Sequence, residues 1–184
     1  MWEEDPETNL EIIKEKSKAD QEEYYKVTST ENIITLIEDH TQQLSAMKSS
    51  PYYKQFDDKI DLWDSNISSI TETLEMLIQV QSKWCYLESI FKGQPELAKQ
   101  LPGEQATFNK IDTLFKAEMT RVHMEKNCYR ALIGKGQDFL KFLTEQNMKL
   151  ESIQKQLQQF LQAKRGMFPR FYFLSDDDLL EIIG

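Results

Sequence analysis

Residues 51–91 decide the fold class, and they read PYYKQFDDKIDLWDSNISSITETLEMLIQVQSKWCYLESIF. No glycine or proline follows Pro51 in this stretch, so nothing interrupts a helix that would span roughly 60 Å. The residues of one face recur at alternating spacings of four and three, the heptad pattern of helices that pack lengthwise. After about residue 74 a second face becomes apolar, so we expect that end of the helix to be covered on two sides. The seam consists of Phe56, Ile60, Trp63, Ile67, Ile70, Leu74, Leu77, Gln81, Trp84, Glu88 and Phe91.

The flanking segments predict further helices beside this one. Thr28–Glu31 resembles a capping box that opens a helix ending near residue 48, and Ser50 with Pro51 suits the cap and first turn of the long helix. Gly93 and Pro95 predict a break. We then expect a helix over residues 104–124, a turn or small helix over 125–136, and a last long helix over 137–165. Residues 6–26 are polar with a thin apolar line, and we expect a helix there too.

Near the end of the chain the pattern changes within a few residues. Gly166 suits a left-handed helix stop, and Pro169 forces Phe168 into an extended conformation. Phe171–Phe173 are strand formers, and Ser175 with Asp178 resembles a capping box of a new helix. The expected fold is therefore mainly α: an elongated bundle of long antiparallel helices with one short strand at about 168–174. Such a strand needs a partner strand or a packed surface.

Composition narrows the function classes. At 184 residues the chain is one domain or one elongated unit, and its net charge of −9 argues against general nucleic-acid binding. No apolar run approaches the roughly 20 residues of a membrane span, and the acidic first residues do not read as a signal peptide. Cys85 and Cys128 suit a reducing compartment. We therefore expect neither a nucleic-acid nor a membrane partner.

Catalytic and metal-binding patterns are scarce. His40 lies on a helix seam, which favours a packed histidine, and His123 with Cys128 does not complete a tetrahedral metal site. Gly134–Gly136 lacks the spacing of a phosphate-binding loop, so turn glycines are favoured. The acidic groups at Asp57–Asp58 and Asp176–Asp178 read better as solvated or helix-start charges than as cation ligands. We expect no catalytic, cofactor-binding or metal-binding residue.

Three sequence blocks, in order, carry a resemblance to a known family. They are VQxxWxYLExIF at 80–91, LPxExxxF at 101–108 and KRxxFPRFYFLSxDDLLEI at 164–182. Together they resemble the linker region of dynein heavy chains, and the resemblance covers roughly residues 31–184. Residues 1–30, read as an N-terminal helix, match weakly because the segment before residue 31 is shorter than is usual in the family. Glu38–His40 and the Phe-Leu-Ser-Asp-Asp ending look more like ciliary, inner-arm dyneins, whereas Ser50–Lys54 is closer to cytoplasmic and intraflagellar types.

The resemblance implies a mechanical role. In the family, the linker arches over a ring of AAA+ ATPase modules and changes shape with the nucleotide state of that ring. ATP and Mg²⁺ would belong to the ring, which lies outside this sequence, so the chain alone is not expected to be an enzyme. The implied partners are the ring of the same heavy chain, subunits of the dynein complex and, indirectly, microtubules, in the cytoskeleton of a cilium or flagellum. The implied interaction residues are Gln81, Trp84, Tyr86, Leu87, Phe91, Lys164, Arg165, Phe168, Pro169, Arg170, Phe171 and Phe173.

Alternatives remain open. A spectrin-like helical scaffold or tether with no motor role would show the same heptads, and an enzyme in its own right would show turnover with ATP. The basic cluster Lys164, Arg165 and Arg170 either neutralises a helix end or meets an acidic partner surface. If the aromatic run contacts the ring, Phe171 and Phe173 should be poorly covered in this chain or covered by its own last helix.

Overall fold

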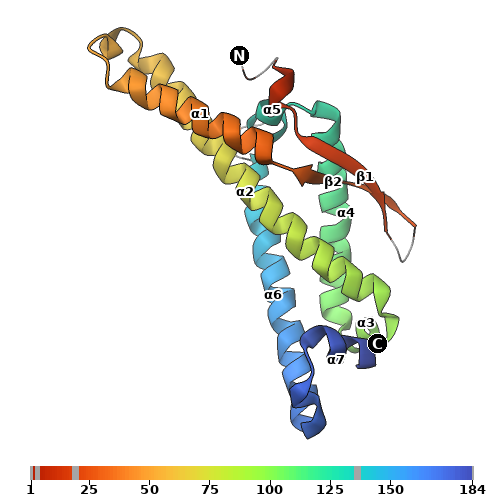
Figure 1. Cartoon of the computed structure of the whole chain (residues 1–184). Helices are drawn as coiled ribbons and strands as arrows, with labels where there is room; N and C mark the ends of the chain where they lie inside the picture. Colours follow the sequence, from red (N-terminus) through yellow and green to blue (C-terminus); the bar gives the residue numbers. More distant parts are fainter. Residues whose placement is uncertain (1, 3–4, 18–20, 135–137, 184) are drawn as a thin grey trace.

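The computed structural model describes residues 2, 5–17, 21–134 and 138–183, and it shows an elongated, mainly helical molecule (Figure 1). The longest element is α2 (Asp57–Gly93), at 37 residues. It runs antiparallel to α1 (Glu31–Lys48) in its first half and packs against α4 (Pro102–Glu125) and α6 (Asp138–Met167) in its second half. The mainly α, elongated architecture expected from the heptad seams is therefore confirmed.

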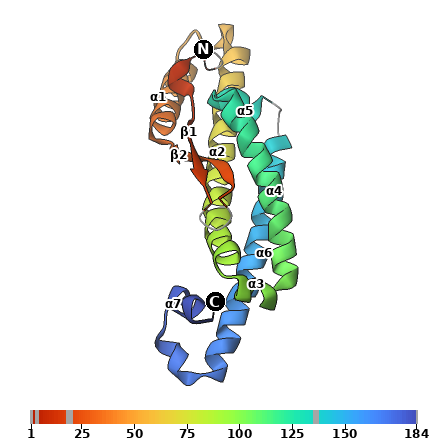
Figure 2. The same ribbon diagram turned by 90° about the vertical axis from the view of Figure 1, so that its right-hand side faces the viewer.

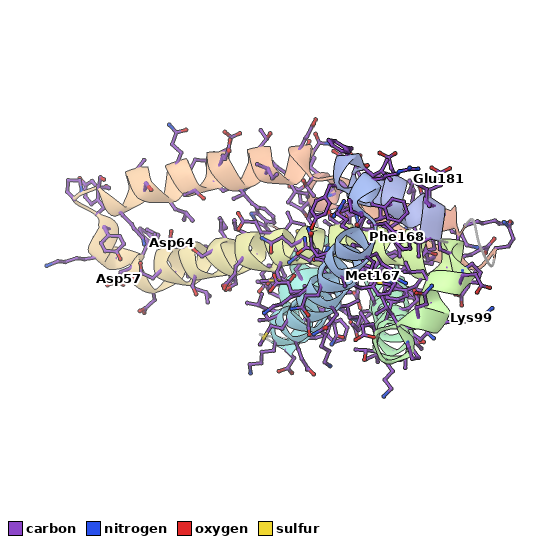
Figure 3. The ribbon with its side chains drawn as sticks, turned by 90° about the horizontal axis from the view of Figure 1, so that it is seen from below. Asp57, Asp64, Lys99, Met167, Phe168 and Glu181 are labelled. Atoms are coloured by element: carbon purple, nitrogen blue, oxygen red, sulfur yellow. The ribbon has the colours of Figure 1, made fainter. Side chains whose placement is uncertain are left out.

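Two parts of the molecule are distinguished by what covers α2. We call α1, residues 49–56 and the start of α2 (57–75) the arm, and the remainder the body. The arm projects away from α4 and α6 as a pair of helices (Figure 3). In the body, α2 is covered on two faces, because Leu77, Val80 and Trp84 all have no exposed surface. The second apolar face that begins near residue 74 is thus confirmed.

Short helices complete the body. They are α3 (Pro95–Gln100) after the break at Gln94, α5 (Cys128–Ile133) between α4 and α6, and α7 (Asp176–Ile183) at the end. Figure 2 shows α7 folded back beside α6, where Leu179 and Leu180 are buried. The core is one contiguous apolar cluster that extends through both parts.

The predicted helix over residues 6–26 is wrong. The structure has a 3-10 turn η1 (Pro6–Thr8) and an antiparallel hairpin of β1 (Glu11–Lys16) and β2 (Glu23–Ser29). This segment contains adjacent β-branched and aromatic residues, Ile12–Ile13 and Tyr24–Tyr25, that favour strands once a partner strand is available. β2 packs on α2 and α4, where Tyr24 packs on Trp84 and Tyr25 stacks on His123, whereas no residue of β1 is buried.

The predicted strand at 168–174 is also wrong. Residues Pro169–Phe173 form a 3-10 helix, η3, in which the Phe171 N–H donates to the Phe168 carbonyl (2.9 Å). Pro169 occupies the first helical position, where its fixed φ and missing N–H cost nothing, and no described segment lies alongside as a partner strand. Gly166 does not stop the preceding helix, which continues through Met167.

Helix starts differ in detail from expectation. The capping box at Ser175 and Asp178 is confirmed, because each residue's side chain accepts a hydrogen bond from the other's backbone N–H, at 3.2 and 3.3 Å. The box at Thr28 does not form: α1 starts after Thr30, which makes no side-chain cap. The long helix starts at Asp57 rather than Pro51, because residues 51–56 form a turn that includes the 3-10 helix η2 (Tyr53–Gln55).

Candidate functional site

The block of the resemblance that lies on α2 joins the hairpin to the helices of the body. The buried side chain of Gln81 donates from Nε2 to the Val27 carbonyl (2.8 Å), and the Val27 N–H donates to Gln81 Oε1 (2.9 Å). Val27 pairs with Ile12 of β1 on its other edge. The Gln81 amide therefore bonds to the edge of β2 that β1 leaves free, as a neighbouring strand would.

Trp84 joins three elements from the centre of the body. Its ring is fully buried, and its centroid lies 5.0 Å from that of Tyr24 on β2 and 5.1 Å from that of Phe115 on α4. The indole Nε1 donates to Asp112 Oδ1 at 3.0 Å, so the polar end of the ring is satisfied. A buried tryptophan of this kind fixes the position of the hairpin relative to both helices.

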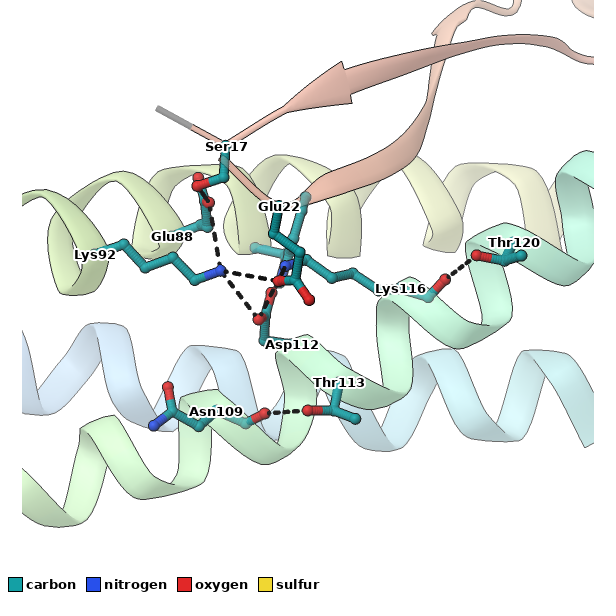
Figure 4. A network of polar contacts seen from close by, with 10 residues as sticks. Ser17, Glu22, Glu88, Lys92, Asn109, Asp112, Thr113, Lys116 and Thr120 are labelled. Carbon is teal, nitrogen blue, oxygen red and sulfur yellow. Dashed lines mark hydrogen bonds and ion pairs between the residues drawn. The ribbon is translucent and has the colours of Figure 1, made fainter. Parts of the chain in front are cut away.

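A nearly buried ionic network surrounds this contact (Figure 4). Lys92 Nζ lies 3.3 Å from Asp112 Oδ2 and 3.6 Å from Glu22 Oε2, and Lys116 Nζ bridges the same two carboxylates. At one end, the Ser17 hydroxyl donates to Glu88 Oε1 at 2.6 Å. Because each of the charges that these helices contribute has an opposite charge beside it, the network ties the hairpin tip to α2 and α4 without leaving an uncompensated buried ion.

The remaining residues of the α2 block divide between core and surface. Leu87 is fully buried, and Phe91 stacks on Phe108 with ring centroids 5.4 Å apart. Tyr86 is 38 % exposed, next to a small hollow of about 260 Å³ between α2, α6 and α7. Burial raises the pKa of Tyr86, and the carboxylates Asp177 and Asp176 add to this effect. Tyr86 is therefore the member of the block that can contact another surface.

The C-terminal block forms an exposed aromatic turn. We use this name for residues Met167–Phe173, which lie where α6 ends and the chain folds back toward α7 (Figure 3). Phe168 is extended, as expected for a residue before proline, and it packs on Phe171 with ring centroids 5.2 Å apart. Phe171 is half-buried against the core, whereas Phe173 is 93 % exposed. The expected poor coverage is thus confirmed for Phe173, and Phe171 is covered in part.

The three basic residues at this turn have different surroundings. Arg165 is buried; its guanidinium donates to the Leu174 carbonyl (2.9 Å) and pairs with Asp176 (2.7 Å). The Lys164 ammonium lies over the Phe160 ring, 5.1 Å from its centroid. Arg170 is exposed on the turn. Arg165 therefore holds the turn in place, and Arg170 is available to a partner surface.

The two histidines and two cysteines pack against other side chains of the fold. The half-buried His40 accepts a hydrogen bond at Nδ1 from Trp2 Nε1 (3.0 Å), and His123 stacks on Tyr25. Cys128 is fully buried, and Cys85 is half-buried against the core. Within the described residues, no three acidic, histidine or cysteine side chains gather as a metal site would require. The expectation for Gly134–Gly136 falls partly on residues 135–137, which lie outside the described residues.

An apolar groove in the arm was not anticipated from the sequence. It has a volume of about 480 Å³ and lies between α1, the turn over residues 50–56 and α2. The heptad spacing predicts Phe56 on the buried seam, yet Phe56 is 55 % exposed at the groove because α2 starts only after it. The aromatic content of Tyr52, Tyr53 and Phe56 was the available signal. None of the described helices is long and apolar enough to cross a bilayer.

Comparison with known proteins agrees with this arrangement. The whole of residues 1–184 matches the family model described as dynein heavy chain, N-terminal region 2. The chain is 43 % identical over 166 residues to the dynein-1-beta heavy chain, flagellar inner arm I1 complex, of Chlamydomonas reinhardtii, covering 90 % of this chain and 4 % of the relative. It is 42 % identical over 177 residues to dynein axonemal heavy chain 2 of Mus musculus, covering 96 % of this chain and 4 % of the relative. It is also 39 % identical over 155 residues to cytoplasmic dynein 2 heavy chain 1 of Homo sapiens, covering 83 % of this chain and 3 % of the relative.

The chain spans only 3–4 % of the length of these relatives, so the shared segment is a small part of each of them. The match runs through the hairpin as well as the bundle, which agrees with a single packed unit. The chain belongs to the dynein heavy chain family, as part of its N-terminal region 2.

Proposed function

We propose that this chain is a segment of the mechanical linker of a dynein heavy chain, which transmits ATP-driven shape changes of an AAA+ ring into movement along microtubules. Family membership and a stiff helical body support this role. The rod of α2, α4 and α6 is joined lengthwise, and the hairpin braces it through Gln81 and Trp84. A braced rod of this kind transmits displacement from one end to the other rather than absorbing it.

The single observation that carries the proposal is the exposed aromatic turn at the end of α6. Phe173 is 93 % exposed although the chain has a large apolar core in which it could be buried. Arg165 bonds to Leu174 and Asp176, which directly follow the turn, and so ties the chain after Phe173 back to α6 while the Phe173 ring stays exposed. Aromatic and arginine residues dominate interface energies, and here Arg170, Tyr172 and Phe173 lie within four consecutive positions. We assign this turn as the contact toward the ring.

The rest of the activity belongs to other parts of the complex. ATP and Mg²⁺ bind to the ring, the microtubule is reached only through it, and this segment is not itself an enzyme. The relatives include heavy chains named for axonemes and for a flagellar inner arm, and we place this protein with them in the cytoskeleton of a cilium or flagellum. The breaks at residues 93–103 and 125–136 are the candidate hinges.

The test is a double substitution in a heavy chain that contains this segment. Replacing Phe171 and Phe173 by Ala should slow microtubule gliding severalfold and leave nucleotide binding by the ring unchanged, because only the mechanical contact is lost. Met148→Ala is the matched control, since Met148 is 67 % exposed on α6 away from the turn. Unchanged gliding velocity in the double variant would favour the alternative of a helical tether without a motor role. Turnover of ATP by the 184-residue chain alone would also contradict the proposal, because it would favour the alternative of an enzyme in its own right.

A further inference from the structure

The arm carries an open apolar groove that the linker role does not use. Its walls are formed by Met47 of α1, by Tyr52 and Phe56 of the turn, and by Trp63 of α2. Trp2 closes the inner end, where its indole N–H donates to His40. Met47, Tyr52 and Phe56 are 49, 70 and 55 % exposed, which places three large apolar side chains on one concave surface. Scattered exposed apolar residues are ordinary, but a concave cluster marks a binding site.

The geometry of the groove favours a helix as its occupant. The arm consists of two antiparallel helices. When only two helices pack together, each covers part of the other's apolar face, and the rest of that face stays exposed. A third helix laid in the groove between them would complete the bundle, with apolar residues at i, i+3, i+4 and i+7 as anchors. In the body, α4 and α6 supply this cover for α2. In the arm, α5 meets α2 where Tyr129 packs on Trp63, but no described α-helix other than α1 and α2 lines the groove.

The net charge of the arm indicates which kind of helix would bind in the groove. Residues 31–75 contain nine acidic and three basic side chains, so the arm carries −6 of the −9 charge of the whole chain. Lys48 is already neutralised by Asp61 and Asp64, at 3.3 and 2.8 Å. Lys59 lies in the groove wall but is preceded by Asp57 and Asp58 at the free end of the arm. The arm therefore attracts a positive partner and repels an acidic peptide or an anionic membrane.

We propose that the groove of the arm binds a basic amphipathic helix of a partner protein. The apolar face of that helix fills the space between Met47, Phe56 and Trp63, and its lysine and arginine side chains reach the acidic surface of the arm. The faces of Trp63 and Tyr52 add cation–π attraction for any of these cations that lies over them. The inference does not depend on the linker role, because the groove and the aromatic turn lie on different elements.

The test uses the 184-residue chain and two synthetic 18-residue helices. Both carry leucine at i, i+3, i+4 and i+7; one has lysine and arginine at the other positions, and its twin has glutamate there. Fluorescence anisotropy of the labelled peptides measures the dissociation constants. We expect the basic helix to bind at least tenfold more tightly than its acidic twin, and Asp57→Asn with Asp58→Asn to weaken it and to reduce its salt dependence.

Variants locate the site on the arm. Met47→Ser with Phe56→Ser should weaken the basic helix at least tenfold, whereas Leu62→Ser should change its affinity by less than twofold. Leu62 is the matched control, because it is 59 % exposed on the same arm but does not line the groove. Circular dichroism checks that each variant keeps its helices. Equal affinity for the two peptides, equal loss in the Leu62 variant, or no saturable binding would overturn the proposal. Self-association of the chain that the groove variants abolish would also overturn it, because the occupant would then be a second copy.

Discussion

At the scale of single residues, Gln81 shows how a polar side chain inside a helix seam can be essential to packing. Gln81→Leu would leave the buried N–H and carbonyl of Val27 without partners. At about 1–3 kcal/mol for each of the two unpaired groups, we expect a loss of about 2–6 kcal/mol of unfolding free energy, measured by urea denaturation. The Val27 amide should also exchange hydrogen faster. Gln159→Leu, on the exposed face of α6, is the control and should change stability little. Full protection of Val27 in the Gln81 variant would contradict this account.

Cys128 gives a prediction for pH. Burial raises the pKa of its thiol to about 12, so the folded protein keeps the thiol neutral when the unfolded chain already ionises it. The stabilisation is complete below the unfolded pKa of about 8.5 and is lost as pH rises above it, by at most about 1.4 kcal/mol per pH unit. The unfolding free energy should therefore fall less between pH 8 and pH 10 in Cys128→Ala than in the unaltered chain.

Iodoacetamide should label Cys128 at pH 8 only after the chain is unfolded. Rapid labelling of the native chain would show that the thiol is accessible.

At the scale of elements, the aromatic turn depends on one buried arginine. Arg165→Leu would remove the hydrogen bond to Leu174 and the ion pair with Asp176, freeing η3 and α7 from the end of α6. Bonds from charged groups contribute about 1.5–3 kcal/mol, so we expect local opening to rise by about tenfold or more in hydrogen exchange over residues 174–183. Arg170→Leu is the matched control, since Arg170 is exposed on the same turn. Equal exchange in both variants would mean that the turn is held by its apolar contacts alone.

The elements also show where sequence reasoning was sufficient and where it was not. Heptad spacing located α2, α4 and α6, and the Ser175 box located α7, because these signals are local and repeat along a face. The sequence predicts a helix at β1 and β2 because β2 packs on both α2 and α4 while β1 is largely exposed, so neither strand shows a simple alternation of buried and exposed residues. The sequence predicts a strand at about 168–174 from Pro169 and the aromatic residues that follow it, but none of the described segments pairs with these residues as a strand.

At the scale of the whole molecule, the prediction concerns shape. A compact domain of 184 residues would have a radius of gyration of about 16 Å. Since α2 alone is about 55 Å long and the arm projects from the body, small-angle X-ray scattering should give a value clearly above this. Ser68→Pro, in the interior of α2 within the arm, should kink or break this helix and change the scattering curve, whereas Ser68→Ala should leave the curve unchanged. A compact radius for the unaltered chain would show that the arm folds back in solution.

The sequence by itself determined that the chain is an elongated helical molecule of the dynein heavy chain family. Heptad spacing, breaks at Gly93 and Pro95, and the three sequence blocks are all read along the chain. Only the tertiary structure decided which members of those blocks are buried and which are exposed. Gln81 bonds to the hairpin and Trp84 packs on it and bonds to α4. Arg165 is buried and bonds to the chain after the aromatic turn, whereas Phe56 and Phe173 are exposed. The physical reason is that burial and pairing depend on segments far apart in sequence, such as Val27 and Gln81, whose meeting no local pattern encodes.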